Sequence, residues 1–224
     1  MKIEYAGLTF QGPVRRKNED NLYINGEFME RIHTDSPLLS GSLDPGKACF
    51  AVFDGLGGEN EGDAASYIAA SHIGNHSLLE INRMICGYTG EKGLRFCGTT
   101  AAVIDIDGDK VSSSNVGDSR IYLLENGEMT RISKDHAKEW NKRRYITQSL
   151  GISSFVIEPY IVDFALKPGS VILLCSDGLT DMLNEKEIRS MLDQNPGQAV
   201  FELKKAVLKK GAVDNTTIVV IKCI

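Results

Sequence analysis

Two aspartates in this chain stand between an apolar run and a glycine. Asp54 ends the run KACFAVFD (47–54) and precedes Gly55, while Asp177 ends SVILLCSD (170–177) and precedes Gly178. Since Asp and Gly are ordinary turn residues, each pair could simply close a strand, with the carboxylate accepting backbone hydrogen bonds. A ligand-binding carboxylate would suit the same neighbours, because glycine lets the backbone approach closely. The pattern leaves both interpretations open.

Further carboxylates occupy comparable positions beside apolar runs. They are Asp214, which stands with Asn215 before the β-branched run TTIVVIK, Glu19 and Asp20 in RRKNEDN, and Asp118 in SSNVGDSR. If these side chains converge, they repel one another unless a cation lies among them, and carboxylate oxygens are ligands that suit Mg²⁺ and Mn²⁺. Two such ions can activate a water for in-line attack on phosphorus. From the pattern alone, a metal site and separate turn or cap roles are equally compatible with these residues.

The composition is that of a globular chain of one large domain or two small ones. Of 224 residues, 42% are hydrophobic and 25% are charged, and the net charge of −5 argues against nucleic-acid binding. No apolar run approaches the roughly 18 residues that span a bilayer, and MKIEYAGLTF lacks the features of a signal peptide. The cysteine number is odd and no C-x-x-C occurs among Cys49, Cys86, Cys97, Cys175 and Cys223. Free thiols and a cytoplasmic location are therefore expected.

Short strands and three helices are predicted to position the carboxylates. The predicted strands are 47–54, 99–106, 110–117, 120–126, 155–166, 170–177 and 216–224. The predicted helices are about 62–83, 184–193 with Asn184 as N-cap, and about 197–210. The turns 107–110, 117–120 and 125–128 have the composition of hairpins. Together they predict an α+β fold with antiparallel sheets, and no phosphate-binding P-loop motif is present.

Eight segments form one ordered pattern along the chain. They are VRRKNED (14–20), AVFDGLGG (51–58) with GDAAS (62–66), GTTAAV (98–103), NVGDSRIYL (115–123), SKDHA (133–137), ITQSLG (146–151), LLCSDGLTD (173–181) and DNTTIVV (214–220). This pattern resembles the type 2C (PPM) family of metal-dependent protein serine/threonine phosphatases, in a minimal bacterial form. The resemblance implies a single catalytic domain over residues 1–224 and a four-layer αββα sandwich of two antiparallel sheets flanked by helices.

The resemblance also implies a role for each matched site residue. Asp54 would bridge two ions of Mn²⁺ or Mg²⁺, Arg15 would bind the substrate phosphate, and a metal-bridged hydroxide would attack phosphoserine or phosphothreonine. The other implied ligands are Asp177 and Asp214 at the first ion, the Gly55 carbonyl with Glu19 and Asp20 at the second, and Asp118 and Asp181 at a weaker third. The implied partner is a phosphorylated protein, in opposition to a serine/threonine kinase. A monomer without nucleic-acid or membrane partners is expected.

Two departures from the family pattern bear on activity. Many members carry a proton-donating histidine at the position of Leu56, and the flap that follows SKDHA is shortened here to about 137–145. The basic stretch KEWNKRRY (138–145) is interpreted either as a solvated loop with an anchoring aromatic residue or as a docking surface for phosphoprotein. The alternative function is a non-catalytic phosphatase-like domain that senses or binds a partner.

Other phosphatase chemistries do not fit the sequence. No cysteine begins the C-x₅-R motif of the cysteine phosphatases, and AVIDIDG (102–108) lacks the Thr or Val of the haloacid-dehalogenase signature. His72 and His76, four residues apart, are expected to pack on a helix rather than to bind metal. A structural hydrogen bond is expected for His136.

Overall fold

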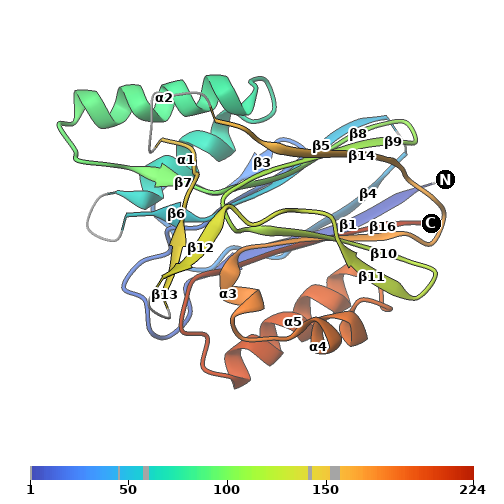
Figure 1. The fold of residues 1–224 in the computed structure, drawn as a ribbon. Helices are drawn as coiled ribbons and strands as arrows, with labels where there is room; N and C mark the ends of the chain where they lie inside the picture. The colour runs from blue at the N-terminus through green and yellow to red at the C-terminus, as the bar shows by residue number, and fades with distance from the viewer. Residues whose placement is uncertain (1, 45, 58–60, 141–142, 152–156) are drawn as a thin grey trace.

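Two six-stranded antiparallel sheets lie face to face in the computed structural model, which describes residues 2–44, 46–57, 61–140, 143–151 and 157–224 (Figure 1). Sheet 1 contains, in spatial order, β11 (Glu128–Arg131), β10 (Arg120–Glu125), β15 (Val171–Cys175), β16 (Thr216–Cys223), β1 (Ile3–Phe10) and β4 (Leu39–Leu43). Sheet 2 contains β14 (Tyr160–Ala165), β9 (Lys110–Val116), β8 (Ala101–Asp107), β5 (Lys47–Phe53), β2 (Asn21–Ile24) and β3 (Glu27–Phe28).

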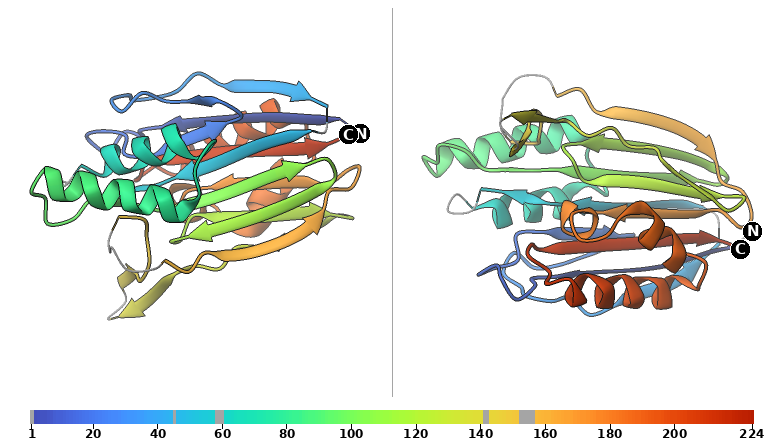
Figure 2. Two further views of the ribbon diagram at one scale, coloured as in Figure 1. Left: turned by 90° about the horizontal axis from the view of Figure 1, so that it is seen from above. Right: turned by 60° about the horizontal axis from the view of Figure 1, so that its bottom comes forward.

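Helices cover the outer faces of both sheets, which gives the predicted four layers (Figure 2). The helices α1 (Gly62–His72) and α2 (Leu78–Glu91) pack on sheet 2. The helices α4 (Glu185–Met191) and α5 (Pro196–Lys209) pack on sheet 1, and the short α3 (Asp177–Thr180) follows β15. The α+β fold class predicted from the sequence is therefore confirmed.

Burial on both faces explains the continuous apolar runs of the central strands. In β16, Ile218 and Val220 contact the helix layer, while Val219 and Ile221 face sheet 2. Successive side chains of a strand point to opposite faces, so a strand covered on both sides is apolar at every position. All five cysteines are free thiols, as expected. Among the described residues, no helix has the length and apolar character needed to cross a membrane.

The prediction of a single helix at 62–83 is wrong, because the chain forms two helices there. It leaves α1 after His72, and Ser77 then caps α2 by a reciprocal capping box with Glu80. Gly74 lies in the break, where a Cβ atom would be only 2.3 Å from the hydroxyl of Tyr23. The periodic spacing of apolar residues runs across this break, whereas the S-x-x-E signature marks the restart.

The turn at 117–120 is not the predicted hairpin. The strand before it, β9, belongs to sheet 2, and the strand after it, β10, belongs to sheet 1, so the turn crosses between the sheets. Gly117 adopts a φ of +95° at this crossing, which glycine tolerates. The hairpins predicted at 107–110 and 125–128 are confirmed between β8 and β9 and between β10 and β11.

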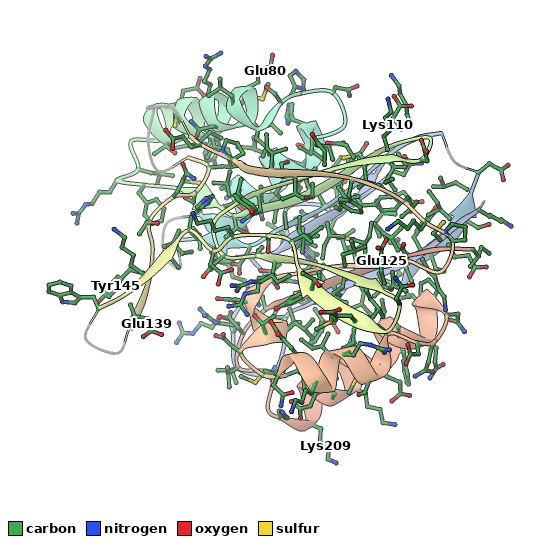
Figure 3. All side chains as sticks on the ribbon, turned by 45° about the vertical axis from the view of Figure 1, so that its right-hand side comes forward. Glu80, Lys110, Glu125, Glu139, Tyr145 and Lys209 are labelled. Carbon is green, nitrogen blue, oxygen red and sulfur yellow. The ribbon has the colours of Figure 1, made fainter. Side chains whose placement is uncertain are left out.

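The flap is a small hairpin rather than a loop with an anchored aromatic. It consists of β12 (Ala137–Trp140) and β13 (Arg143–Ile146), and Trp140 is 70% exposed. Figure 3 shows Glu139 and Tyr145 on this hairpin, which projects from the body of the molecule. Lys142 in the basic stretch, and the start of the strand predicted at 155–166, lie outside the described residues. The described part of that strand, β14, begins at Tyr160.

A second short strand pair closes the same end of the sandwich. It pairs β6 (Gly55–Leu56) with β7 (Gly98–Thr99). Both pairs lie at the end of the sheets opposite the two chain termini (Figure 1). The segments that carry the predicted site residues therefore leave the sheets at one end.

Candidate active site

Five aspartates from five separate segments converge at one end of the sheets. This is the end where β5 and β15 stop and where β10 begins. The aspartates are Asp54, Asp20, Asp118, Asp177 and Asp214. Burial raises the pKa of Asp54 well above its ordinary value, and the charges of the other four raise it further. The carboxyl groups of Asp177 and Asp54 are in hydrogen-bond contact. The structure thus brings together side chains that the sequence places far apart.

Two neighbours of Asp54 show the same effect. Burial, opposed by two hydroxyl hydrogen bonds and reinforced by the charges of Asp177 and Asp214, raises the pKa of Asp20 to about 7. Burial and the charges of Asp118, Asp214 and Asp181 raise the pKa of Asp177 to about 7. Burial raises all three carboxyl pKa values and mutual repulsion adds to the effect, so the site is suited to a bound cation.

Two threonines hold the main chain of Asp54. The Asp54 amide donates to Thr100 Oγ1 at 3.0 Å, while the Thr100 amide and the Thr99 hydroxyl both donate to the Asp54 carbonyl at 2.9 Å. Thr100 Oγ1 also lies 2.7 Å from Ser119 Oγ, next to the buried Asp118. The GTT segment therefore fixes Asp54 and the crossing turn relative to each other.

Asp20 is held by the segments that carry two other aspartates. Its Oδ2 accepts hydrogen bonds from Ser176 Oγ at 2.8 Å and Thr217 Oγ1 at 2.7 Å. Ser176 directly precedes Asp177, and its Oγ also accepts the amide of Thr217 at 2.9 Å. Asp20 is 2% exposed, so these bonds compensate for its burial between the two sheets.

Asn215 performs a similar task for Glu19. The Glu19 amide donates to Asn215 Oδ1 at 2.9 Å, and Ser66 Oγ donates to the Glu19 carbonyl at 2.6 Å. Asn215 Nδ2 donates in turn to the carbonyls of Gln11 and Lys17, both at 3.0 Å. The loop that carries Arg15 and Glu19 is thereby attached to the residue that follows Asp214.

The glycines after Asp54 and Asp177 are required by close backbone packing. A Cβ atom at Gly55 would lie 2.3 Å from the Glu19 carbonyl oxygen, and one at Gly178 would lie 2.0 Å from the Asn215 carbonyl oxygen. The glycines thus permit two close approaches, one between the Asp54 and Glu19 segments and one between the Asp177 and Asp214 segments. Gly58, in the same glycine-rich turn, lies outside the described residues.

Replacing Gly178 by alanine is expected to destabilise the protein by about 1–3 kcal/mol or more, because a backbone oxygen blocks the added methyl group. The melting temperature should fall by at least about 2–4 °C per kcal/mol. Gly87→Ala in α2 is the matched control: its Cβ would meet nothing within 4 Å, so it should be neutral or stabilising. Equal melting temperatures for the two variants would contradict the packing argument.

Arg15 lies at the solvent-exposed rim of the cluster. Its guanidinium forms an ion pair with Asp214, and its side chain is 48% exposed. Partial burial lowers the pKa of Arg15, but the hydrogen bond to Asp214 and the charges of Asp214, Asp54 and Glu19 outweigh that effect and raise it. The exposed guanidinium beside a carboxylate cluster can receive an anion from solvent.

Two predicted residues are less deeply placed. Asp181 is exposed at the end of α3, where its charge still acts on Asp177. Leu56 is partly exposed on β6 and cannot donate a proton.

His136 makes the expected structural bonds: its amide donates to the Gly117 carbonyl at 2.8 Å, and its Nδ1 accepts the Gly117 amide at 3.2 Å.

The donor set fits a hard divalent cation, because it consists of carboxylate oxygens that repel one another. Within the described ranges, however, no three His, Cys, Asp or Glu side chains are arranged to hold an ion as they stand. Asp214 is paired with Arg15, and Glu19 with Lys17. Cation binding would therefore require these carboxylates to exchange one positive partner for another.

A separate groove shares no residue with the carboxylate cluster. This groove of about 800 Å³ lies over β5, β8, β9 and β14, beside Gly74, and Cys49, Asp105 and Asp163 are among its lining residues. Burial, and then its neighbour Asp105, raise the pKa of Cys49, so the thiol there is unreactive. The converging carboxylates lie at the other site, outside this groove.

The sequence interpretation missed residues that orient the site. Thr99, Thr100, Ser66 and Asn215 all occur within the matched segments, but their roles depend on contacts between segments. The sequence feature that could have identified these residues is the clustering of small hydroxyl and amide side chains beside the aspartates. His72 and His76 pack edge to face with ring centroids 5.5 Å apart, which is the packing on a helix expected for them.

Comparison with known proteins agrees with this geometry. Residues 64–223 match the family described as Stage II sporulation protein E (SpoIIE). The chain is 27% identical to serine/threonine protein phosphatase PstP of Mycobacterium tuberculosis over 97% of its own length, but it spans only 44% of that relative. It is 26% identical to serine/threonine phosphatase Stp of Listeria welshimeri, with 96% of this chain and 93% of that relative covered.

Solved structures show the same fold. PppA, a regulatory component of the type VI secretion system of Pseudomonas aeruginosa, superposes with a TM-score of 0.82 at 25% identity, covering 99% of this chain and 98% of that one. The catalytic domain of PstP in complex with two manganese ions superposes with a TM-score of 0.77 at 24% identity, covering 99% of each chain. With the family match extending over most of its length, the chain belongs to the SpoIIE-related, type 2C (PPM) family of metal-dependent protein serine/threonine phosphatases.

Proposed function

We propose that this chain hydrolyses phosphoserine and phosphothreonine in proteins at a two-metal carboxylate site. The observation that carries the proposal is the convergence of five aspartates, with Arg15 at their solvent-exposed edge. The family membership and the names of the relatives support the same activity. A non-catalytic binding domain would not need to keep every carboxylate of a repulsive cluster.

The proposed ligand set follows the positions of the carboxylates. Asp54 would be shared between two ions, with Asp177 and Asp214 at one and Glu19, Asp20 and the Gly55 carbonyl at the other. Mn²⁺ or Mg²⁺ bound there would supply an activated water and offset charge on the phosphoryl oxygens. The manganese-bound PstP domain supports this choice. Asp118 and Asp181 are proposed for a weaker third ion, and of these only Asp118 is buried in the cluster.

Arg15 is proposed to bind the phosphate of the substrate. A guanidinium can donate to two phosphate oxygens at once, and Arg15 is exposed enough to do so. Its present partner, Asp214, would be released when a cation takes up that carboxylate. Cation binding and phosphate binding would then support each other through this one exchange of partners.

The leaving group is proposed to take its proton from solvent. Leu56 occupies the position of the family's proton donor and has no ionisable group. The flap is shortened to one short hairpin, β12–β13, and is proposed to leave the edge of the site open. Water can therefore reach the leaving oxygen and donate the proton. The turnover rate would be lower by the roughly 10²-fold that a positioned general acid supplies.

The cellular setting is proposed from the same chemistry. The substrate would be a phosphorylated protein, produced by a serine/threonine kinase that the chain opposes. We further propose that the chain acts as a monomer in the cytoplasm, as a single catalytic domain.

The proposal is tested by turnover of a phosphothreonine peptide and of p-nitrophenyl phosphate with increasing Mn²⁺. Both substrates should be hydrolysed by the wild-type chain, and Asp177→Asn should abolish both activities, because it removes a ligand without changing the shape of the side chain. Lys210→Met, which breaks a distant ion pair with Glu187, should leave activity unchanged. A pure wild-type chain without turnover at millimolar Mn²⁺ would favour the non-catalytic alternative.

A further inference from the structure

A chain of ion pairs connects Glu19 to the first turn of α1. Lys17 Nζ lies 2.9 Å from Glu19 Oε1 and 2.7 Å from Asp63 Oδ1. The second oxygen of Asp63, Oδ2, accepts Arg31 Nε at 2.7 Å. Each oxygen of Asp63 is thus bound by a different cation. Lys17 is shared between Asp63 and a residue of the proposed metal site.

Arg31 is held on its far side by α2 and by the residue that precedes α1. Its Nη1 donates to Tyr88 Oη at 3.0 Å, and its Nη2 lies 3.4 Å from Glu61 Oε2. Tyr88 Oη donates to the same Glu61 oxygen. Asp63 is therefore anchored to two helices. These contacts orient the Asp63 carboxylate independently of Lys17.

Burial strengthens the ion pairs that Lys17 makes with Glu19 and Asp63. The side chains of Asp63 and Glu19 are each 10% exposed, whereas that of Lys17 is 44% exposed. Charges that are shielded from water interact more strongly than exposed surface pairs. Partial burial raises the pKa of Asp63, but its bonds to Lys17 and Arg31 outweigh that effect and lower it. Asp63 is a stable anion in this position.

We infer that Asp63 is a positioning residue that sets how Glu19 presents itself to a divalent cation, acting through Lys17. The Lys17 ammonium lies 2.9 Å from Glu19 Oε1, a buried oxygen without a hydrogen-bond partner, so its charge restrains the carboxylate while that oxygen can still accept an ion. The main chain of Glu19 is already held by Asn215 and Ser66. With the lysine charge beside one oxygen and the main chain held, the orientation of the Glu19 carboxylate is restricted.

Asp63 also limits the competition between Lys17 and a metal ion. Without the Asp63 carboxylate, the Lys17 ammonium would interact with Glu19 and no longer with Asp63. Its positive charge would then repel a metal ion at Glu19. With Asp63 present, the lysine charge is shared. Loss of Asp63 should therefore weaken cation binding at Glu19, both by loosening the carboxylate and by leaving Lys17 entirely on it.

This inference rests on the proposed function and is tested by calorimetric titration of Mn²⁺ into the metal-free full chain. Asp63→Asn should raise the dissociation constant of one Mn²⁺ site by about tenfold or more, the usual effect of removing a group that orients a ligand. At saturating Mn²⁺ the KM for a phosphopeptide should not change, because Arg15 is untouched. Lys210→Met, which removes an ion pair of the same 2.7 Å length whose lysine is 42% exposed, is the control and should bind Mn²⁺ normally.

A double-mutant cycle establishes the route through Lys17. In a Lys17→Met background, Asp63→Asn should change the dissociation constant by less than about twofold, because the connecting cation is gone. Asp63→Ser replaces Asp63→Asn if circular dichroism shows that the latter does not fold.

Three outcomes would count against the idea in different ways. Equal Mn²⁺ affinity of Asp63→Asn and wild type would overturn the inference, and so would an equal loss of affinity in both backgrounds. A wild-type chain that binds no Mn²⁺ would overturn the proposed function together with it.

Discussion

Asp54→Asn is expected to abolish phosphatase activity and, at the same time, to stabilise the metal-free protein. The carboxylate interacts with four other aspartates, so its negative charge is unfavourable until a cation arrives. Asparagine keeps the shape of the side chain and the main-chain bonds from Thr99 and Thr100, but it removes the charge. Turnover should fall by at least about 10³-fold, the upper range for loss of one electrostatic group in an active site.

The stability effect should appear as a higher melting temperature without metal at pH 8. Active sites commonly carry such a conflict, in which a functional group weakens the fold. Asp163→Asn, on the exposed edge strand β14, is the matched control and should change neither quantity. An Asp54→Asn variant that melts below wild type in the absence of metal would show that repulsion does not dominate there.

The second large effect concerns pH. Asp20 and Asp177 have a pKa of about 7 in the folded chain, against an ordinary value of 3.8. Between about pH 4 and pH 7 the folded state therefore binds more protons than the unfolded state, so the stability of the metal-free protein must decrease as the pH rises through this range. Mn²⁺ should reverse this decrease, because it replaces the departing protons.

The measurement is the melting temperature at pH 5.5 and pH 8, with and without Mn²⁺. The metal-free protein should melt lower at pH 8, and the increase caused by Mn²⁺ should be larger at pH 8 than at pH 5.5. Burial lowers the pKa of His33 and His136, which acts in the opposite direction below pH 6.5. Asp177→Asn separates the two effects: it should flatten the pH dependence, and a slope equal to that of wild type would refute the assignment.

The positions of the site aspartates could be predicted because they are tied to strand ends. An apolar run buried on both faces must stop where its backbone leaves the sheet, and the D-G pairs mark that point in β5 and β15. The start of helix α4 could be predicted equally well, because Asn184 and Glu187 form the capping box that the sequence suggests. These features depend on neighbours within a few residues.

Other features depend on segments that meet only in the fold. The four residues at 117–120 have the composition of a hairpin, and nothing local reveals that β9 and β10 join different sheets. The strand β1 escaped prediction because Glu4 interrupts its apolar pattern, although β16 covers it on one edge. Asp63 lay within a matched segment, but its role requires Lys17 and Arg31 from two other loops.

The crossing at 117–120 places Asp118 between the two sheets. Because the carboxylates come from segments attached to both sheets, ions bound among them would join the two sheets at one end, much as a cross-link does. Detachment of either sheet would then have to break metal–ligand bonds first, which places the ions in the barrier to unfolding. The supply of divalent metal would in that way set the resistance of the chain to proteolysis as well as its rate of turnover.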